Sequence, residues 1–324
     1  MSEQPLIEVR NLKKYFPLRS GFFNRVTGHV KAVDGISFTI PRGKTMGLVG
    51  ESGCGKSTTG KTLLRLEEKT SGDVLFEGRE IYDIGTKEMR RLRPKLQIIF
   101  QDPYSSLSPR LPVGEIIGEA VREHRIVPPD EFDEYVTRIM LASGLQEYHK
   151  LRYPHEFSGE QRQRICIARA LALNPRFIVC DEPVSALDVS IQAQIINLLE
   201  ELQAQFDLAY LFISHDLSVV QHISDFVGVM YLGSMVETAS KEEIFAHPLH
   251  PYTEALFSAI PVPDPDYKMK RIILEGSIPS PARPPSGCKF HTRCAKAMPK
   301  CSETAPEMIE AAPGHFVSCH LFGG

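Results

Sequence analysis

Short apolar runs bounded by turn residues alternate with segments of helical period along this chain, and the alternation predicts an α/β fold. The predicted strands cover residues 6–12, 29–33, 36–40, 45–49, 72–78, 96–101, 177–182 and 209–214, followed by a hairpin over 225–238 with its turn at 232–234. Helical periodicity predicts helices over residues 58–66, 113–145, 162–173 and 191–206, and two short helices within 241–260. Residues 17–29 contain proline, glycine and several basic side chains, and are predicted to form an exposed loop.

A phosphate-binding pattern, G-x-x-x-x-G-K-[ST], is fulfilled by residues 50–57 between a predicted strand and a predicted helix. The glycines let backbone N–H groups turn toward a phosphate, Lys56 reaches the β- and γ-phosphates of a nucleotide, and Ser57 can ligate Mg²⁺. A chance glycine turn is the alternative, but strand, loop, Lys-Ser pair and helix occur here in the required order. The predicted phosphate-binding residues are Gly50, Ser52, Gly53, Cys54, Gly55, Lys56, Ser57 and Thr58.

Polar residues that suit ATP hydrolysis follow three of the predicted strands. Asp181 and Glu182 end the apolar run that begins at residue 177; Asp181 is predicted to hold Mg²⁺, and Glu182 to orient or deprotonate the attacking water. Gln101 can offer its carbonyl oxygen to Mg²⁺ or to that water, and His215 can touch the γ-phosphate or the glutamate. Taken singly, each of these residues could also be a solvated or structural strand end.

The composition of the chain limits the kinds of partner and the cellular location that we expect. With 42% hydrophobic residues the 324-residue chain can bury a large core, and its net charge of −3 does not indicate a nucleic-acid partner. No apolar run approaches the roughly 18 residues that span a membrane, and residues 1–5 lack the order of a signal peptide. The chain is therefore expected to stay in the cytoplasm.

The tail contains a cluster of cysteines. Cys288, Cys294, Cys301 and Cys319 follow the spacing C-x5-C-x6-C-x17-C, and four thiolates can close a zinc site or hold an iron–sulfur cluster. Free thiols in a loosely packed tail are the alternative. Because the tail is short, we expect metal ligation to order it, and we expect the proline-rich residues 261–285 to keep it apart from the phosphate loop.

Six motifs in this order resemble the ATP-binding-cassette (ABC) ATPases over about residues 6–260. They are the phosphate loop, Gln101, Ser-Gly-Glu-Gln at 158–161, Asp181-Glu182, Ser185-Ala186-Leu187-Asp188 and His215. The resemblance implies a P-loop NTPase core of the ABC type with an antiparallel β subdomain and a helical signature subdomain. The implied ATPase domain covers residues 1–260, with the helical subdomain at about 103–165, a linker at 261–285 and a small cysteine-rich C-terminal region at 286–324.

The same resemblance implies a head-to-tail dimer that encloses ATP and Mg²⁺. In that arrangement Ser158, Gly159 and Gln161 face the partner's γ-phosphate, Asp188 links the two sites, and Phe16 stacks on adenine, although ordinary strand packing is an alternative for Phe16. The family signature usually reads Leu-Ser-Gly-Gly-Gln, whereas residue 157 here is phenylalanine and residue 160 is glutamate. We expect the carboxyl group of Glu160 to add like charge near a polyphosphate, so that Glu160→Gly would tighten ATP-driven dimerisation or raise turnover.

A narrower resemblance, to the ATP-binding subunits of dipeptide and oligopeptide importers, extends over nearly the whole chain. It is carried by residues 184–194, His250-Pro251-Tyr252-Thr253, residues 260–265 and the cysteine-bearing tail. It implies ATP hydrolysis that energises peptide import, with two membrane permease subunits, a second ATPase subunit and an extracytoplasmic peptide-binding protein as partners. The loop around Gln101 and the helices at 113–145 would dock on the permeases, which places the chain peripherally on the cytoplasmic face of the membrane. Some members of this family carry a [4Fe-4S] cluster in the tail, which favours a cluster over zinc.

Three alternatives stay open at this stage. The chain could energise import of another solute such as nickel, or be a soluble ABC ATPase acting on nucleic acid or ribosomes. The second of these would be expected to show a basic stripe or a coiled-coil insertion, and neither is visible. A redox protein built on the tail cluster would not need the hydrolysis motifs that precede it.

Overall fold

The computed structural model describes residues 4–20, 24–260 and 271–323. The described residues divide into two compact units, each discontinuous in sequence. The first unit is drawn from Met1–Leu6, Ile40–Thr45 and Glu80–Ile213, and the second from Ile7–Thr39, Met46–Arg79 and Ser214–Gly324.

The first unit contains three neighbouring parallel strands, β6 (Leu96–Ile99), β7 (Phe177–Asp181) and β8 (Ala209–Ile213). Every residue of β7 and β8 is buried, as expected for parallel strands whose two faces are both covered. In their register Asp181 lies opposite Ile213, so these two strands end side by side. The predicted strands at 96–101, 177–182 and 209–214 are thereby confirmed.

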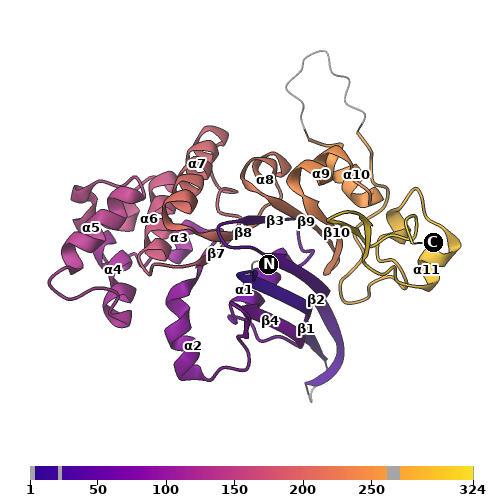
Figure 1. The fold of residues 1–324 in the computed structure, drawn as a ribbon, viewed down its shortest axis with the longest axis horizontal. Helices are drawn as coiled ribbons and strands as arrows, with labels where there is room; N and C mark the ends of the chain where they lie inside the picture. Colours follow the sequence, from indigo (N-terminus) through magenta and orange to yellow (C-terminus); the bar gives the residue numbers. More distant parts are fainter. Residues whose placement is uncertain (1–3, 21–23, 261–270, 324) are drawn as a thin grey trace, which may run out of the picture. The chain divides into compact units, whose positions relative to one another are not determined.

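Helices make up most of the remainder of this unit. They are α2 (Thr86–Leu92), α3 (Pro103–Ser106), α4 (Val113–His124), α5 (Phe132–Ala142), α6 (Gly159–Leu171) and α7 (Val189–Phe206), with 3-10 turns at Arg93–Lys95, Glu147–Leu151 and Pro154–Glu156. The helices predicted within 113–145 are confirmed as α4 and α5, which pack on each other and on α6 through apolar faces that include Ile117, Val121 and Val136 (Figure 1). The helix predicted over 191–206 is confirmed as α7.

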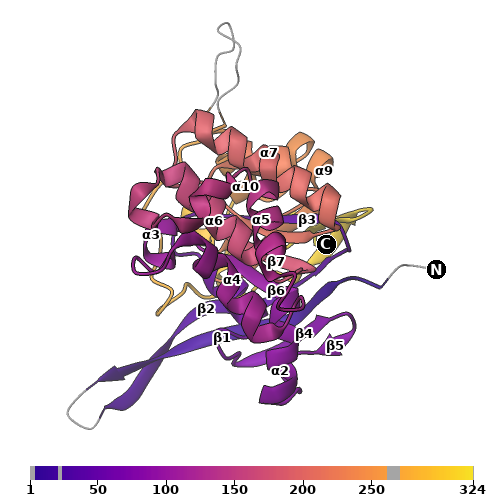
Figure 2. The same cartoon turned by 90° about the vertical axis from the view of Figure 1, so that its left-hand side faces the viewer.

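The second unit has an antiparallel sheet formed by β2 (Arg25–Ile40), β1 (Ile7–Ser20) and β4 (Ser71–Phe76), in that order. Two expectations are wrong here. Residues 17–20 and 25–29 are strand, not loop, and the strands predicted at 29–33 and 36–40 are parts of the single strand β2. Figure 2 shows β1 and β2 running side by side as a long ribbon. Because residues 17–20 and 25–27 are exposed on the ribbon, they have no buried face that would produce apolar alternation in the sequence.

A second sheet of this unit contains β3 (Thr45–Val49), which is parallel to β9 (Phe226–Tyr231), and β10 (Ser234–Ser240), which forms the predicted hairpin with β9. Two tail strands extend it, because β12 (His315–Val317) pairs with β10 and β11 (Ile309–Ala312) pairs with β12. The tail also buries Phe290, which is 1% exposed. Packing on β10 and burial of Phe290 are therefore a source of order for the tail that the expectation of metal ligation did not include.

Short helices complete the second unit. They are α1 (Lys56–Leu63), α8 (Leu217–Ile223), α9 (Lys241–Ala246), α10 (Pro251–Phe257) and α11 (Pro299–Glu303), with a 3-10 turn at His291–Arg293. The two helices predicted within 241–260 are confirmed as α9 and α10. Residues 271–285 of the predicted linker contain no helix or strand, and its residues 261–270 lie outside the described residues. The two-residue strand β5 (Arg79–Glu80) spans the sequence boundary between the units.

Candidate nucleotide site

The phosphate loop joins β3 to α1 in the second unit, as the sequence predicts. Two of its glycines are required by geometry. Gly50 has φ +148° and a Cβ atom there would lie 2.2 Å from the carbonyl oxygen of Met230, while Gly55 has φ +109° and its Cβ would lie 2.0 Å from that of Ala32. Any side chain at either position would displace a neighbouring strand, because both obstacles are backbone atoms.

Lys56 directs its ammonium group into this loop. The side chain is 4% exposed, and Nζ donates to the carbonyl oxygens of Gly50 at 2.7 Å and Glu51 at 3.2 Å. Burial raises the pKa of the Cys54 thiol, so this side chain is a protonated packing group, and its main chain is the part that can serve a phosphate. Ser57 and Thr58 lie in the first turn of α1, while Ser52 and Gly53 are exposed.

The tail reaches the phosphate loop, contrary to the expectation that the linker keeps the two apart. Arg293 donates through Nη1 to Oε2 of Glu51 at 2.7 Å and through Nη2 to Oε1 at 3.1 Å. Tyr252 of α10 accepts a hydrogen bond from the Glu51 N–H at 2.9 Å. Sequence reasoning missed Glu51, Tyr252 and Arg293 as site residues, although Tyr252 lies in the recognised stretch 250–253 and Arg293 directly precedes a tail cysteine.

In the first unit the structure brings together two residues singled out for hydrolysis. Gln101 donates through Nε2 to Oε2 of Glu182 at 2.9 Å, and it lies 3.5 Å from Oγ of Ser185. Glu182 has φ +48°, uncommon for a residue with a side chain, and its N–H donates to the carbonyl oxygen of Ile213 at 3.0 Å. Asp181, the last residue of β7, is 5% exposed. A carboxylate held in this way by an amide has a defined direction, as a residue that orients water requires.

The signature stretch forms the start of α6. Ser158 caps the helix: Oγ accepts from the N–H of Gln161 at 3.3 Å, and the Gln161 side chain accepts from the Ser158 N–H at 3.1 Å. The unusual Glu160 is paired with Arg164 one turn later, with Nε to Oε1 at 2.8 Å. This ion pair offsets the carboxylate charge that the sequence suggested would oppose a polyphosphate.

Three further predicted residues, His215, Asp188 and Phe16, lie on or next to other elements. His215 belongs to the second unit and is exposed, and the next residue, Asp216, caps α8. Asp188 is the exposed N-cap residue of α7 in the first unit. Phe16 is on β1, with Nζ of Lys14 4.5 Å from its ring centroid.

The four tail cysteines lie in the second unit, near enough for their thiols to influence one another. Burial raises the pKa of Cys288 to about 11, and the thiols of Cys294, Cys301 and Cys319 add to this rise. Across the described residues, however, no set of three or more histidine, cysteine or acidic side chains is arranged to hold a metal ion. In the positions they occupy in this structure, the four thiols are not arranged to coordinate one metal ion.

Comparison with known proteins identifies the family. Residues 33–185 match the family described as ABC transporter, and residues 236–301 match the one described as oligopeptide/dipeptide transporter, C-terminal region. The oligopeptide transport ATP-binding protein AppF of Bacillus subtilis (strain 168) is 56% identical, over 99% of this chain and 98% of AppF. The chain belongs to the ABC transporter family. A putative peptide import ATP-binding protein of Brucella ovis, BOV_A0347, is 52% identical over 98% of both chains.

Solved ABC structures share the fold. CbiO1 from Clostridium perfringens, described as part of the ABC transporter complex cbiONQ, is 28% identical with a TM-score of 0.65, over 76% of this chain and 92% of its own. The ATP-binding cassette MJ0796, solved as a dimer with ADP and Pi, is 24% identical with a TM-score of 0.64, over 72% of this chain and 98% of its own. The ABC ATPase fold expected from the sequence is thereby confirmed. A helix with the length and apolar character needed to cross a bilayer is not found in the described part of this family member.

Proposed function

We propose that this chain is the ATP-hydrolysing subunit that energises import of di- and oligopeptides across the cytoplasmic membrane. The observation that carries the proposal is full-length identity of 56% to an oligopeptide transport ATP-binding protein. The match of residues 236–301 to the oligopeptide/dipeptide C-terminal region supports peptide in preference to another solute, because that region is additional to the cassette itself.

For the nucleotide, we assign phosphate binding to the glycine loop and Lys56. Lys56 already has its ammonium group among loop carbonyls, and phosphate oxygens would replace Gly50 and Glu51 as its acceptors. Mg²⁺, which neutralises charge on the phosphates, would be held by oxygen atoms of Ser57, Asp181 and Gln101. Phe16 is assigned to stacking on adenine.

For hydrolysis, we assign the general base to Glu182, which would accept a proton from water as that water attacks the γ-phosphate. Gln101 positions the carboxylate by its hydrogen bond, and His215 is assigned to the γ-phosphate. Ser158, Gly159 and Gln161 would serve the nucleotide of a partner cassette, and Asp188 would link the two sites of the dimer.

We further propose the assembly that such an activity requires: two permease subunits, a second cassette and an extracytoplasmic peptide-binding protein. The chain would bind peripherally at the cytoplasmic face of the membrane, with the loop around Gln101 and helices α4 and α5 against the permeases. In the tail, we propose a structural metal centre on Cys288, Cys294, Cys301 and Cys319, preferably [4Fe-4S] and otherwise zinc. The presence of four cysteines within residues 288–319 supports it, and closing the site would require these side chains to converge.

The test is transport by the reconstituted complex. Proteoliposomes should take up a labelled oligopeptide only when ATP is on the side of this subunit and the peptide-binding protein is on the other. Lys56→Ala in this subunit should abolish nucleotide binding by it and strongly reduce uptake. Peptide-independent hydrolysis without uptake, or uptake of nickel but not peptide, would contradict the proposal.

A further inference from the structure

Arg293 joins the tail to the phosphate loop through a two-pronged ion pair. Both terminal nitrogens of its guanidinium group contact the two carboxylate oxygens of Glu51, at 2.7 and 3.1 Å. The Arg293 side chain is 6% exposed and that of Glu51 is 24% exposed, so the pair is largely withdrawn from water. The two parallel hydrogen bonds fix the orientation of the Glu51 carboxylate in addition to balancing its charge. A lysine could balance the charge but could not fix the orientation in this way.

Glu51 is held at every polar group. Its carboxylate is taken by Arg293, its N–H donates to the hydroxyl oxygen of Tyr252 at 2.9 Å, and its carbonyl accepts from Nζ of Lys56 at 3.2 Å. The carbonyl also accepts from the N–H of Cys54 at 3.2 Å. The position of Glu51 is therefore coupled directly to the lysine that serves the phosphates.

Charge gives the pair a second role. A carboxylate within a loop that receives a polyphosphate opposes the ligand unless a cation compensates it, and at partly buried positions this opposition is poorly screened. Arg293 supplies that cation. The guanidinium group also lies over the ring of Tyr231, with the guanidinium carbon 5.9 Å from the ring centroid.

The rest of the tail is anchored without Arg293. Lys289 donates to Asp34 at 2.8 Å, to the carbonyl oxygen of Leu232 at 2.9 Å and to Ser234 at 2.7 Å. Phe290 packs edge-on against Tyr231, and the β12–β10 pairing adds backbone hydrogen bonds. Removing the Arg293 charge should therefore leave the tail docked.

We propose that Arg293 is a positioning residue for nucleotide binding: from the tail, it holds Glu51 so that the phosphate loop is preformed and its acidic charge is cancelled. The inference rests on the proposed ATP-binding function. It makes the tail a working part of the nucleotide site, in addition to any metal that the tail cysteines bind.

The test compares binding of Mg²⁺ with the non-hydrolysable analogue AMP-PNP by calorimetry, using the full chain and its variants. Arg293→Met keeps an apolar stem but removes the charge, and should weaken binding about tenfold, the usual effect of losing a charge-assisted contact of this kind. Arg293→Lys should be intermediate. The matched control is Lys296→Met. It removes a tail ion pair with Glu254 (2.7 Å) in which the lysine side chain is 49% exposed, and it should bind like the parent.

Two further readouts separate positioning from tail anchoring. Adding Glu51→Gln to Arg293→Met removes the uncompensated charge and should restore most of the affinity. The defect of Arg293→Met should also shrink between about 50 mM and 500 mM salt, since screening weakens repulsion. Parental affinity in Arg293→Met, or a defect that neither Glu51→Gln nor salt relieves, overturns the inference. Absence of binding by the parent chain would instead overturn the proposed function on which it rests.

Discussion

Glu182 combines an uncommon backbone conformation with a side chain held by a neighbour. A positive φ of +48° costs a residue with a side chain about 1 kcal/mol or more, and the surrounding structure must supply that energy. The hydrogen bonds from Gln101 to its carboxylate and from its own N–H to Ile213 do so locally. Strain of this kind at a strand end is characteristic of sites where a side chain must be aimed.

We therefore expect Glu182→Gln to slow ATP hydrolysis by at least about 100-fold, because an amide cannot accept the proton from water and general-base assistance is worth about 10²–10⁴. ATP affinity should remain within about threefold of the parent, and the cassette dimer should accumulate with ATP bound. Phosphate release by the assembled complex and gel filtration with ATP measure these effects. Hydrolysis at the parental rate would show that another group is the base.

The structure changes the expected effect of replacing Glu160, the carboxylate in the signature stretch. From the sequence, Glu160→Gly should tighten ATP-driven dimerisation or raise turnover by removing like charge, but the structure pairs Glu160 with Arg164 at 2.8 Å. With the charge already offset, Glu160→Gly should change turnover less than twofold and should loosen the start of α6, because glycine is a poor helix former by about 1 kcal/mol.

The informative variant is Arg164→Met, which leaves the Glu160 carboxylate without this partner and should lower turnover several-fold. The double variant Arg164→Met with Glu160→Gln should recover it. Steady-state hydrolysis by the complex measures all three variants. A several-fold gain in Glu160→Gly alone would instead support the expectation from sequence.

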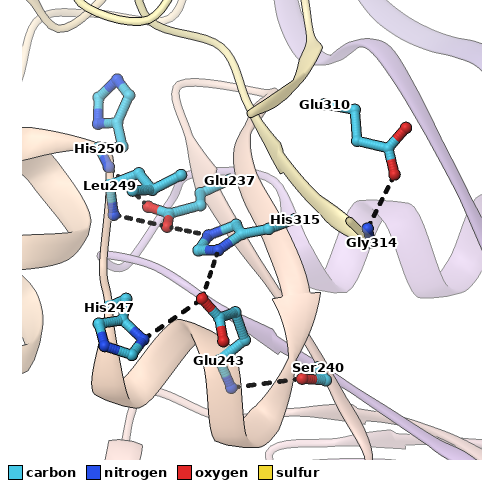
Figure 3. A network of polar contacts seen from close by, with 9 residues as sticks. All are labelled: Glu237, Ser240, Glu243, His247, Leu249, His250, Glu310, Gly314 and His315. Atoms are coloured by element: carbon cyan, nitrogen blue, oxygen red, sulfur yellow. Dashed lines mark hydrogen bonds and ion pairs between the residues drawn. The ribbon is translucent and has the colours of Figure 1, made fainter. Parts of the chain in front are cut away.

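At the scale of elements, a buried contact between a histidine and a carboxylate joins the tail hairpin, formed by β11 and β12, to β10. Glu237 and His315 are both fully buried, and Nε2 of His315 lies 2.7 Å from Oε1 of Glu237 (Figure 3). The same carboxylate accepts from the N–H groups of Leu249 and His250, each at 2.8 Å. One acid thus ties together β10, β12 and the start of α10.

Glu237→Gln should lower the free energy of unfolding by about 3 kcal/mol. The variant replaces one carboxylate oxygen, which accepts hydrogen bonds, with an NH₂ group that can only donate, so that buried donors lose their acceptor. Urea unfolding measures the loss, and hydrogen exchange should show it first in β11 and β12. Glu310→Gln is the matched control: its exposed carboxylate accepts from Gly314 within the same hairpin and should cost less than about 0.5 kcal/mol (Figure 3). Equal losses in the two variants would contradict the assigned importance of Glu237.

At the scale of the whole molecule, the proposed metal centre in the tail predicts that loss of the metal impairs assembly of the transporter complex. Anaerobically purified chain should contain iron and sulfide if the tail holds a cluster, or one zinc if it does not. Cys294→Ser should lose the metal and then tail order or complex assembly before it loses nucleotide binding. Metal analysis of the purified variants tests this. The control is Cys166→Ala, which replaces a buried cysteine of the first unit and should keep the metal. Parent protein that contains neither iron nor zinc would contradict the proposed metal centre.

The sequence by itself determined the features that depend on residues close together in the chain. Residues 50–57 identify a phosphate loop because strand, glycines, Lys56 and helix are contiguous, and the Asp181-Glu182 pair is marked by the apolar run directly before it. Family resemblance then correctly indicated the ABC fold. In the outer part of the β1–β2 ribbon, residues 17–20 and 25–27, no buried face imposed a pattern, and this part of the two strands was predicted as a loop.

Tertiary structure alone decided the pairings between distant residues. Gln101 meets Glu182 across 81 positions, His315 meets Glu237 across 78, and Arg293 meets Glu51 across 242. Such pairs depend on strand register and on how the tail docks, and neither leaves a periodic trace in the local sequence. For the same reason the tail could be recognised as a cysteine-bearing segment from its sequence, while its contact with the phosphate loop could be seen only in the folded chain.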